Sequence, residues 1–476
     1  CTYNGARTLA QCLRSLAALD YPDYEIIVVD DGSTDATRAI VEQFPEVRAI
    51  HQPNRGLSVA RNVGLHAARG AIVAYTDDDC FADPDWLTHL VYQLQRSGAD
   101  AVGGPNLTPE DGWLAACVAA SPGQPTHVLE SDQIAEHIPG CNMAFRRDAL
   151  LAINGFDPLY RKAGDDVDVC WRLQQAGKWI TFAPAAFVWH HRRQGPRSYI
   201  KQQVGYGEAE SLLYVKHPDR FNYRGEGIWR GALYGDALRG LCFGKPIIYH
   251  GTFATGFFQC IYQPGPAHWA LFPATLEWHL LAGLVAVAGF LAPWLWAVSA
   301  GMLALSVGVA WLQAAQAQLP ARHDGVLSRV VVAGLCYIQP LVRAWARYRA
   351  RLFAARAPNV DGELVDVPKE RLSLRGERTV DYWTEDGYER MELLGLVIAY
   401  LNERRWQKVV DAGWGNWDLQ VYVSRWTFVE VCTVHQNEGG SRRLIRVRHR
   451  LRTRASFWLA GAVGGLGAAA CLLVDE

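Results

Sequence analysis

The sequence contains no CxxC pair, no excess of charge of either sign and no glycine-rich, lysine-bearing loop of the kind that holds phosphates. Its 11 cysteines are scattered, which argues against a zinc knuckle, a thioredoxin-like site and an evident disulfide framework. We therefore expect reduced thiols in a cytosolic compartment. Lysine and arginine total 47 against 48 for aspartate and glutamate, so global charge does not point to nucleic acid as a partner.

The chain starts at Cys1, without an initiator methionine and without the charged and apolar segments of a secretory signal. We expect that residues upstream of Cys1 are missing from this sequence. A length of 476 residues exceeds what one ordinary hydrophobic core organises. The length therefore predicts two or three domains.

Charged side chains are absent from one long apolar stretch, because no Asp, Glu, Lys or Arg occurs from Trp278 to Ala321. This stretch is too long for a single crossing of a hydrocarbon layer of about 30 Å. It predicts a transmembrane helical hairpin over residues 276–320, with its turn near Pro293. The alternative is a helical hairpin buried in a soluble core, where a charge-free run of this length is unusual.

Two further apolar segments follow the hairpin. Residues 326–350 are interrupted by Arg329, which favours an interfacial helix over a third membrane helix. Residues 457–474 are long enough for a C-terminal transmembrane helix. Arginines are frequent after the hairpin and before the last segment, and cytoplasmic loops carry such an excess. The pattern predicts a multi-pass protein of the inner cell membrane whose N-terminal region is cytoplasmic.

Residues 1–220 alternate between strand and helix patterns, as in "YEIIVVD" before "DGSTD" and "GLSVARNVGLHAARG" before "AIVAYT". This order predicts an α/β domain with a mostly parallel, Rossmann-like sheet and helices on its faces. Ligands of such sheets bind beyond the carboxyl ends of the strands. We therefore expect the functional residues where the strands end.

Acidic residues follow two of these strands. Asp30 and Asp31 end one strand, and Asp77, Asp78 and Asp79 end another, so both groups are expected at one rim. Neighbouring carboxylates repel one another unless a cation or water intervenes, and carboxylate oxygens suit Mg²⁺ or Mn²⁺. The rim therefore predicts a divalent-cation site. Taken alone, "DDGSTD" is also typical of a turn and helix cap, and "TDDDC" of a solvated acidic turn.

Three motifs, in this order, carry a resemblance to a known family. They are "CTYNGARTLAQCLRSLAALDYPDYEIIVVDDGSTDAT", "NRGLSVARNVGLHAARGAIVAYTDDDC" and "GDDVDVCWRLQQAG". Over residues 1–215 the chain resembles a family 2 glycosyltransferase of the GT-A fold, although only Cys1 and Thr2 remain of the apolar strand that opens such proteins. The resemblance implies an inverting, metal-dependent transfer of a sugar from a nucleotide diphosphate sugar.

The resemblance also implies a place for each residue of the acidic motif. Asp79 would contact the metal directly, and Asp77 would lie towards the ribose and the metal. A divalent ion held by carboxylates offsets charge on the departing diphosphate. The other residues that the resemblance implies for nucleotide-sugar binding are Thr2, Tyr3, Asp31, Arg61 and Asp78.

A second acidic pair lies in "GDDVDVCWRL". By resemblance, Asp166 takes the place of the catalytic base that removes the acceptor's proton. Asp165, where the family more often has the longer glutamate, is the second catalytic residue that the resemblance implies. The alternative is that these acids only cap a helix, because a helix dipole favours acids in its first turn.

Three further residues are weaker candidates. The segment "PGCNMAFRRDAL" resembles the family's donor- and acceptor-facing segment, which makes Asn142 and Arg146 candidates for nucleotide-sugar binding; an ordinary turn before a helix is the alternative. His190 follows a strand where some GT-A enzymes place a histidine near the metal, so we expect it among the metal ligands. A structural histidine is the alternative.

The remainder of the chain suggests where the reaction takes place. Residues 221–275 are aromatic and glycine-rich, which suits a membrane-proximal segment, and residues 378–455 predict a small cytoplasmic α+β domain. The expected acceptor is lipid-linked or an envelope glycan at the membrane. The chain has "KQQVGYG" where processive synthases carry QxxRW, which favours a single transfer. Two hypotheses stay open beside this one: a degenerate GT-A nucleotide-binding or scaffold protein, and a nucleotidyltransferase.

Overall fold

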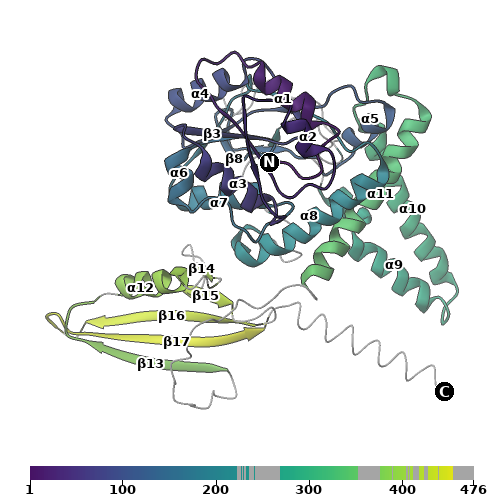
Figure 1. The fold of residues 1–476 in the computed structure, drawn as a ribbon. Coiled ribbons are helices and arrows are strands. Elements are labelled where there is room, and N and C mark those ends of the chain that lie inside the picture. The colour runs from purple at the N-terminus through teal and green to yellow at the C-terminus, as the bar shows by residue number, and fades with distance from the viewer. Residues whose placement is uncertain are drawn as a thin grey trace, which may run out of the picture. The chain divides into compact units, whose positions relative to one another are not determined.

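The structure is a computed structural model of the chain (Figure 1). The chain forms two units, Cys1–Leu212 with Ile228–Arg349, and Leu213–Gly227 with Ala350–Glu476, and each is described by itself. The predicted helix at 457–474 and most of the segment 221–275 lie outside the described residues. The structure describes residues 1–221, 227, 229, 232–234, 241, 268–351 and 376–453, the last range with gaps at 389, 404–405, 407, 411–416, 423–426 and 438.

The first unit begins with a parallel pair of strands covered by helices. Apolar residues of the first helix recur at helical spacing, so Leu9 and Leu13 share one face and pack with Val28 and Val47 of the strands. The strand β1 ends at Asp30, as predicted. The elements are α1 (Leu9–Ala17), β1 (Ile26–Asp30), α2 (Thr37–Val41), β2 (Val47–His51) and α3 (Leu57–Ala67).

The main sheet is mixed and has the strand order β12-β7-β8-β10-β5-β9-β3. The predicted α/β class is confirmed, but among the described strands parallel pairing is limited to β1 with β2, β5 with β10 and β6 with β11. A short turn joins β7 to β8, and such a turn permits only antiparallel pairing. The strands are β3 (Ile72–Thr76), β5 (Ala101–Gly103), β7 (His127–Leu129), β8 (Ile134–His137), β9 (Asn142–Arg146), β10 (Ile180–Phe182) and β12 (Ala232–Tyr234).

Helices cover both faces of the main sheet, as Figure 1 shows for β3 and β8. On one face Leu65 of α3, Leu150 of α6 and Leu173 of α7 are buried in a single cluster with strand residues. On the other face Leu90 and Leu94 of α4 belong to a second cluster. These helices are α4 (Trp86–Ser97), α6 (Arg147–Ala152) and α7 (Asp165–Gln175), and α5 (Trp113–Ala119) and α8 (Pro196–Lys216) belong to the same unit apart from the last turn of α8.

A small three-stranded sheet brings distant segments to the acidic motif. Its order is β4-β11-β6, and the antiparallel pairing of β4 with β11 sets Cys80 opposite His190. Cys80 directly follows Asp79, so this pairing places a residue from the end of the domain beside the predicted metal motif. The strands are β4 (Cys80–Ala82), β6 (Asn106–Leu107) and β11 (Val188–His190).

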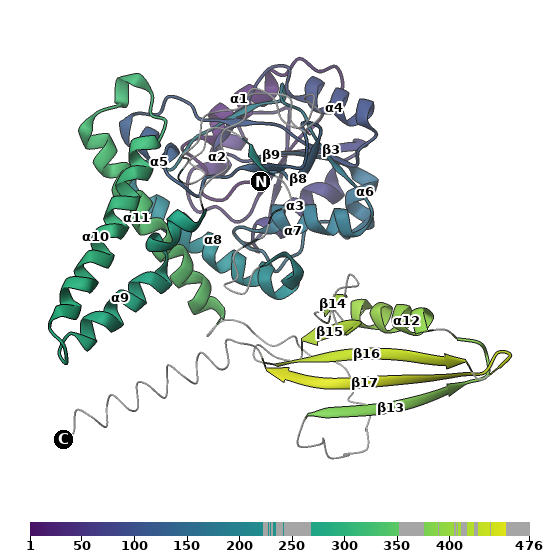
Figure 2. The ribbon, with the colours of Figure 1, turned by 180° about the vertical axis from the view of Figure 1, so that it is seen from behind.

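Among the described residues, three α-helices of the first unit follow its α/β region (Figure 2). Two of them, α10 (Trp294–Gln316) and α11 (Val326–Arg349), are long and apolar enough to cross a membrane by length and composition. The 13 residues of α9 (Leu276–Ala288) rise about 20 Å at 1.5 Å per residue, which is less than the roughly 30 Å of a bilayer core. The predicted turn falls at Pro293, the N-cap of α10.

One side of α11 packs on the α/β region through α5 and α8. Arg343 and Arg347 both form ion pairs with Glu210 of α8, at 2.7 and 3.2 Å. These contacts fix the C-terminal half of α11 against protein. The segment 326–350, predicted to be interfacial or a third membrane helix, is therefore a continuous helix with one protein-facing side.

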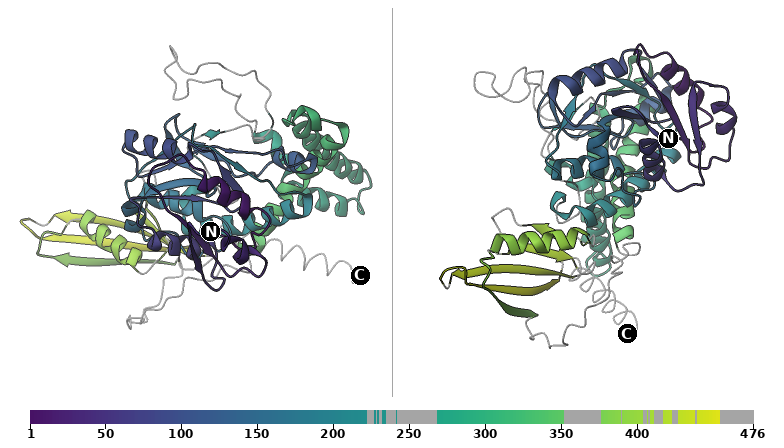
Figure 3. Two further views of the ribbon diagram at one scale, coloured as in Figure 1. Left: turned by 45° about the horizontal axis from the view of Figure 1, so that its top comes forward. Right: turned by 60° about the vertical axis from the view of Figure 1, so that its left-hand side comes forward.

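The second unit contains an antiparallel sheet with one helix against it (Figure 3). Its strand order is β13-β17-β16-β15-β14. Arginines of β17 face acids of adjacent strands: Arg446 pairs with Asp381 at 2.7 Å and Arg452 with Glu430 at 3.1 Å. The elements are β13 (Glu377–Thr384), α12 (Arg390–Glu403), β14 (Lys408–Val410), β15 (Leu419–Tyr422), β16 (Thr427–Asn437) and β17 (Arg443–Thr453).

Candidate active site

Arg61 connects the two acidic motifs. It lies on α3, and its side chain is 3% exposed. The guanidinium forms an ion pair with Asp165 of α7, and Nη2 lies 3.2 Å from Asp77 Oδ1 and 3.2 Å from the carbonyl oxygen of Gly140. Burial disfavours the charge, but the two carboxylates raise the pKa of Arg61. One buried cation therefore links the segment after β3 to the start of α7.

Two adjacent carboxylates begin α7, and their environments differ. Burial raises the pKa of Asp165, and its guanidinium partner opposes that rise. Asp166 accepts hydrogen bonds from the backbone N–H groups of Gly140, at 3.0 Å, and Val167, at 2.9 Å. Burial also works against the charge of Asp166, but His137, 3.7 Å away, and other contacts lower the pKa of Asp166 to about 2. Asp166 is therefore ionised at neutral pH.

Three successive carboxylates follow β3, and each has a different partner. Asp77 faces Arg61, whereas the hydroxyl of Thr2 donates to Asp78 Oδ2 over 2.5 Å. Burial, with the neighbouring aspartates, raises the pKa of Asp78 to about 6. The backbone N–H of Thr2 also donates to the Val29 carbonyl oxygen of β1. Thr2 thus joins the two acidic groups that the sequence predicts at one rim.

Asp79 lies between side chains from β11 and the residues after it. Its Oδ1 is 3.2 Å from His190 Nε2, and its Oδ2 is 3.4 Å from Arg193 Nη1. Burial opposes ionisation, but His190 and Arg193 lower the pKa of Asp79. His190 Nδ1 lies 3.0 Å from Arg192 Nη1. Because a guanidinium can only donate, Nδ1 accepts, and Nε2 carries the ring proton towards Asp79.

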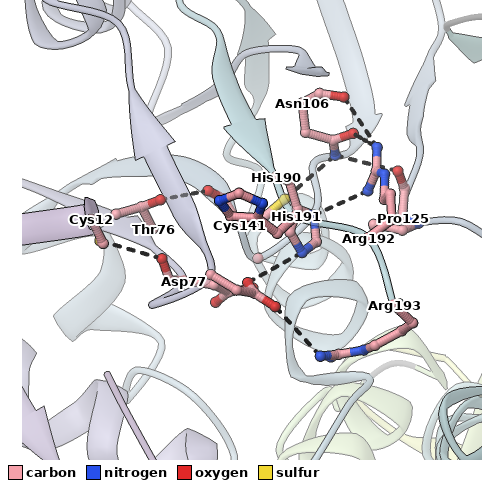
Figure 4. Close-up of polar contacts among 12 residues, drawn as sticks. Cys12, Thr76, Asp77, Asn106, Pro125, Cys141, His190, His191, Arg192 and Arg193 are labelled. Carbon is pink, nitrogen blue, oxygen red and sulfur yellow. Dashed lines mark hydrogen bonds and ion pairs between the residues drawn. The ribbon is translucent and has the colours of Figure 1, made fainter. Parts of the chain in front are cut away.

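The residues predicted as metal ligands come together. Asp77, Asp79 and His190 each offer one ligand atom, and these atoms lie within 4.8 Å of one another. Figure 4 shows the His190 ring beside the Cys141 sulfur, and Cys80, Cys141 and His190 form a second such group. The two carboxylates suit Mn²⁺ or Mg²⁺, whereas an imidazole ligand suits a transition metal and not Mg²⁺. His190 would first have to release the proton that it directs at Asp79.

Comparison with known proteins assigns the N-terminal region. Residues 1–153 match the family model described as Glycosyl transferase family 2. Glycosyltransferase AglE of Haloferax volcanii is 31% identical over 219 residues, a region that covers 44% of this chain and 71% of that protein. The chain belongs to glycosyltransferase family 2. The family model ends before Asp165, so the pair at the start of α7 lies beyond the matched residues.

Two further proteins named as glycosyltransferases are similar over a comparable length. Pre-mycofactocin glycosyltransferase of Mycobacterium tuberculosis is 30% identical over 228 residues, 46% of this chain and 46% of that protein. Glucosyl-dolichyl phosphate glucuronosyltransferase of Haloferax volcanii is 29% identical over 215 residues, 40% of this chain and 67% of that protein. The chain thus spans about half the length of the mycobacterial protein that it matches.

Two of the residues predicted to bind nucleotide lie at the rim in different settings. Asp31 is buried and accepts from the side chain of Gln52, at 2.6 Å, and from the backbone N–H groups of Arg55 and Gly56, each at 2.8 Å. It therefore fixes the loop that leads into α3. Tyr3 is 53% exposed, which leaves its aromatic ring available to a ligand.

Asn142 and Arg146, at the two ends of β9, have structural partners. Asn142 accepts from the indole N–H of Trp86, at 2.8 Å, and donates to the carbonyl oxygens of Pro105 and Ala186. Arg146 donates to carbonyl oxygens at and after the C-terminal end of α4. In this state both side chains hold the strand in place.

One site residue, His137, was not predicted from the sequence, and Arg193 stood only in a basic run that suits a diphosphate or an anionic lipid. His137 ends β8 and faces Asp166, and Arg193 follows β11 and faces Asp79. In the sequence, His137 is recognisable only as a polar residue in the strand "IAEH". Arg193 is recognisable only as part of the basic run "HHRRQGPR". Neither pattern predicts a partner, because both contacts depend on strand pairing between distant segments.

Gly5 lies against the contact between Thr2 and Asp78. A Cβ atom at Gly5 would be 2.1 Å from Asp78 Oδ2 and 2.5 Å from Thr2 Oγ1. We expect Gly5→Ala to displace Asp78 and to lower the free energy of unfolding by about 1–3 kcal/mol, measured by thermal unfolding. Gly195→Ala is the matched control, because a Cβ there meets no described atom within 4 Å. Equal unfolding midpoints for the two variants would contradict this account.

Proposed function

We propose that the chain transfers a sugar from a nucleotide diphosphate sugar, with inversion at the anomeric carbon and with the aid of Mg²⁺ or Mn²⁺. The observation that carries the proposal is the buried guanidinium of Arg61, which contacts both Asp77 and Asp165. It connects a motif suited to a metal and diphosphate with the helix start that bears Asp166. A site for the leaving group and a site for the base are thus parts of one hydrogen-bonded unit.

The proposed reaction is a single displacement. The acceptor oxygen attacks the anomeric carbon while the bond from that carbon to the diphosphate oxygen breaks, and the nucleoside diphosphate leaves with the bonding electrons. Asp166 takes up the proton of the acceptor hydroxyl. Its two backbone N–H contacts and its low pKa support an ionised carboxylate that is ready to accept this proton.

The part of the site that holds the diphosphate needs positive charge to stabilise this leaving group. When bound, a divalent ion would offset the charge that develops on the diphosphate. Asp77 and Asp79 would hold it, with His190 as a further ligand once deprotonated. Arg193, whose side chain is 44% exposed, would add a second cation near the diphosphate. Thr2, Tyr3, Asp31 and Asp78 would surround the nucleotide, with the exposed ring of Tyr3 stacking on the base.

We further propose that the acceptor is presented at a membrane, as a lipid-linked sugar or an envelope glycan. Support comes from the exposed apolar side chains along α10, which include Leu303, Val307 and Trp311. The name of the similar Haloferax volcanii glucuronosyltransferase contains a dolichyl phosphate. The proposal includes a multi-pass location in the inner membrane with the catalytic unit in the cytoplasm. Because such an anchor would keep the active site close to the membrane, it would favour acceptors at the membrane surface.

Nucleotide binding tests the proposed donor site. We expect one of UDP, GDP or TDP to bind the detergent-purified chain in the presence of Mn²⁺, and EDTA to weaken this binding at least tenfold, measured by calorimetry. Asp79→Asn should cause a similar loss, because it removes a charge from the proposed metal site. Asp85→Asn, at an exposed carboxylate without a cap hydrogen bond, is the matched control. Tight binding that neither EDTA nor Asp79→Asn alters would overturn metal dependence.

A further inference from the structure

His137 faces the proposed base with an unoccupied nitrogen. The side chain lies at the end of β8 and is 9% exposed. Nδ1 is 3.1 Å from the carbonyl oxygen of Thr126. Since a carbonyl only accepts, Nδ1 carries a proton, and in a neutral ring Nε2 presents a lone pair. Nε2 is 3.7 Å from Asp166 Oδ2, and among the described residues it has no hydrogen-bond partner.

Two proton acceptors therefore face each other in a buried place. Such an arrangement is unfavourable unless a proton or a hydroxyl group lies between the two atoms. His137 Nε2 is buried away from solvent, so among the described residues the atom placed to exchange a proton with it is Asp166 Oδ2, 3.7 Å away. The pair is thus one proton short of a hydrogen bond between the two side chains.

We propose that the proton removed from the acceptor hydroxyl comes to rest on His137 Nε2. This inference rests on the proposed function. As the acceptor oxygen bonds to the anomeric carbon and the diphosphate leaves, the O–H proton passes to Asp166 and from there to the imidazole. The products are the glycoside, the nucleoside diphosphate and a carboxylate–imidazolium pair. The pair returns to its initial state when the proton is lost to water.

The surroundings favour the proton on the imidazole. Although burial opposes it, contacts with His137, Arg61 and the backbone N–H of Gly140 lower the pKa of Asp166 to about 2, so this carboxylate readily gives up a proton that it has taken up. The ring of Trp229 lies 5.4 Å from the His137 ring at 38°, and 5.4 Å from the buried Trp171. An aromatic face at this distance stabilises a cation. Trp229 therefore covers the imidazolium on one side.

Three titratable groups near the pair, Arg61, His127 and Tyr206, keep a constant charge at neutral pH. Arg61 stays cationic beside Asp165. Burial, and the approach of His137, lower the pKa of His127 on β7 to about 3, so His127 is neutral. Burial, and the charge of Asp166, raise the pKa of Tyr206 on α8 to about 12, so its hydroxyl stays protonated.

Nitrogen NMR of the full chain with ¹⁵N-labelled histidine, in detergent, tests the proton's location. The His137 signal is the one lost in His137→Gln. We expect the neutral ring to carry its proton on Nδ1, and Asp166→Asn to lower the proton affinity of His137 at least tenfold. His127→Gln, in the neighbouring strand, should change that affinity less than threefold. An Nε2-protonated neutral ring, or an affinity unaffected by Asp166→Asn, would overturn the proposal.

Kinetics provides the second readout and separates the two proposals. The donor in this assay is the sugar conjugate of whichever nucleotide binds, and the acceptor is water. We expect His137→Gln to lower kcat at least tenfold while the KM for the donor changes less than twofold. Unchanged kcat in a folded His137→Gln variant would also overturn the inference. If the wild-type chain binds no nucleotide and releases none, the proposed function fails and the inference with it. If the wild-type chain turns over and folded His137→Gln turns over equally fast, the inference alone fails.

Discussion

Asp166→Asn is expected to lower the rate of nucleoside diphosphate release by about 10²- to 10⁴-fold, the usual contribution of a general base. The amide keeps the shape of the carboxylate but cannot take up the acceptor's proton. Affinity for the nucleotide should stay within about threefold, because Asp166 contacts backbone N–H groups and His137 rather than the metal motif. Turnover and calorimetry on the same preparation check both statements.

The matched control for this variant is Asp148→Asn. Asp148 is exposed and stands in the first turn of α6, as Asp166 stands in the first turn of α7. If these acids served only the helix dipole, worth about 0.3–1 kcal/mol each, the two variants would behave alike. A folded Asp166→Asn variant with normal turnover would show that the carboxylate is a helix-capping residue and not the base.

Arg61→Met is expected to lower the free energy of unfolding by about 3–5 kcal/mol, the typical cost of leaving a buried charge without its partner. The side chain is 3% exposed, and its removal leaves Asp165 buried without the guanidinium. Thermal unfolding of the variant measures the loss. Arg61→Lys keeps a charge and should recover part of the stability, but not the contacts that a planar guanidinium makes with two carboxylates.

The loss of unfolding free energy in Arg61→Met should depend on pH and should grow as the pH rises. Without the guanidinium, burial leaves the pKa of Asp165 in the folded state above its unfolded value. The folded state then binds the proton more tightly, so the variant is most stable below the ordinary aspartate pKa of about 4 and loses stability as the pH rises through the raised value. A deficit that is the same at pH 5 and pH 8 would contradict the buried ion pair.

The rim residues illustrate what the sequence could predict. Asp77 to Asp79 were recognisable because three acids follow an apolar strand, and their chemistry is local to the motif. The role of Thr2 was not recognisable, because its hydroxyl reaches Asp78 across 76 positions of sequence. Arg61 was predicted near the nucleotide, whereas its contacts with Asp77 and Asp165 follow from the packing of α3 against α7.

The sheet shows the same limit of prediction from sequence, because strand pairing is not local. The alternation of strands and helices predicted the α/β class, but pairing direction depends on which strands meet. The turn between β7 and β8 and the insertion of β9 between β3 and β5 make the sheet mixed. These pairings also bring His137 to Asp166, and the pairing of β4 with β11 brings His190 to Asp79. These two contacts of the candidate site therefore arise from non-local pairing that periodicity does not encode.

The configuration of the released sugar tests the central claim most directly. The chain is incubated with an α-linked nucleotide diphosphate sugar of the base that binds, with water as acceptor, and the anomer that appears first is observed by proton NMR before mutarotation. A single displacement with Asp166 as base predicts the β-anomer as first product. Release of the α-anomer first, or no release from a chain that binds the nucleotide tightly, would contradict an inverting transferase at this site.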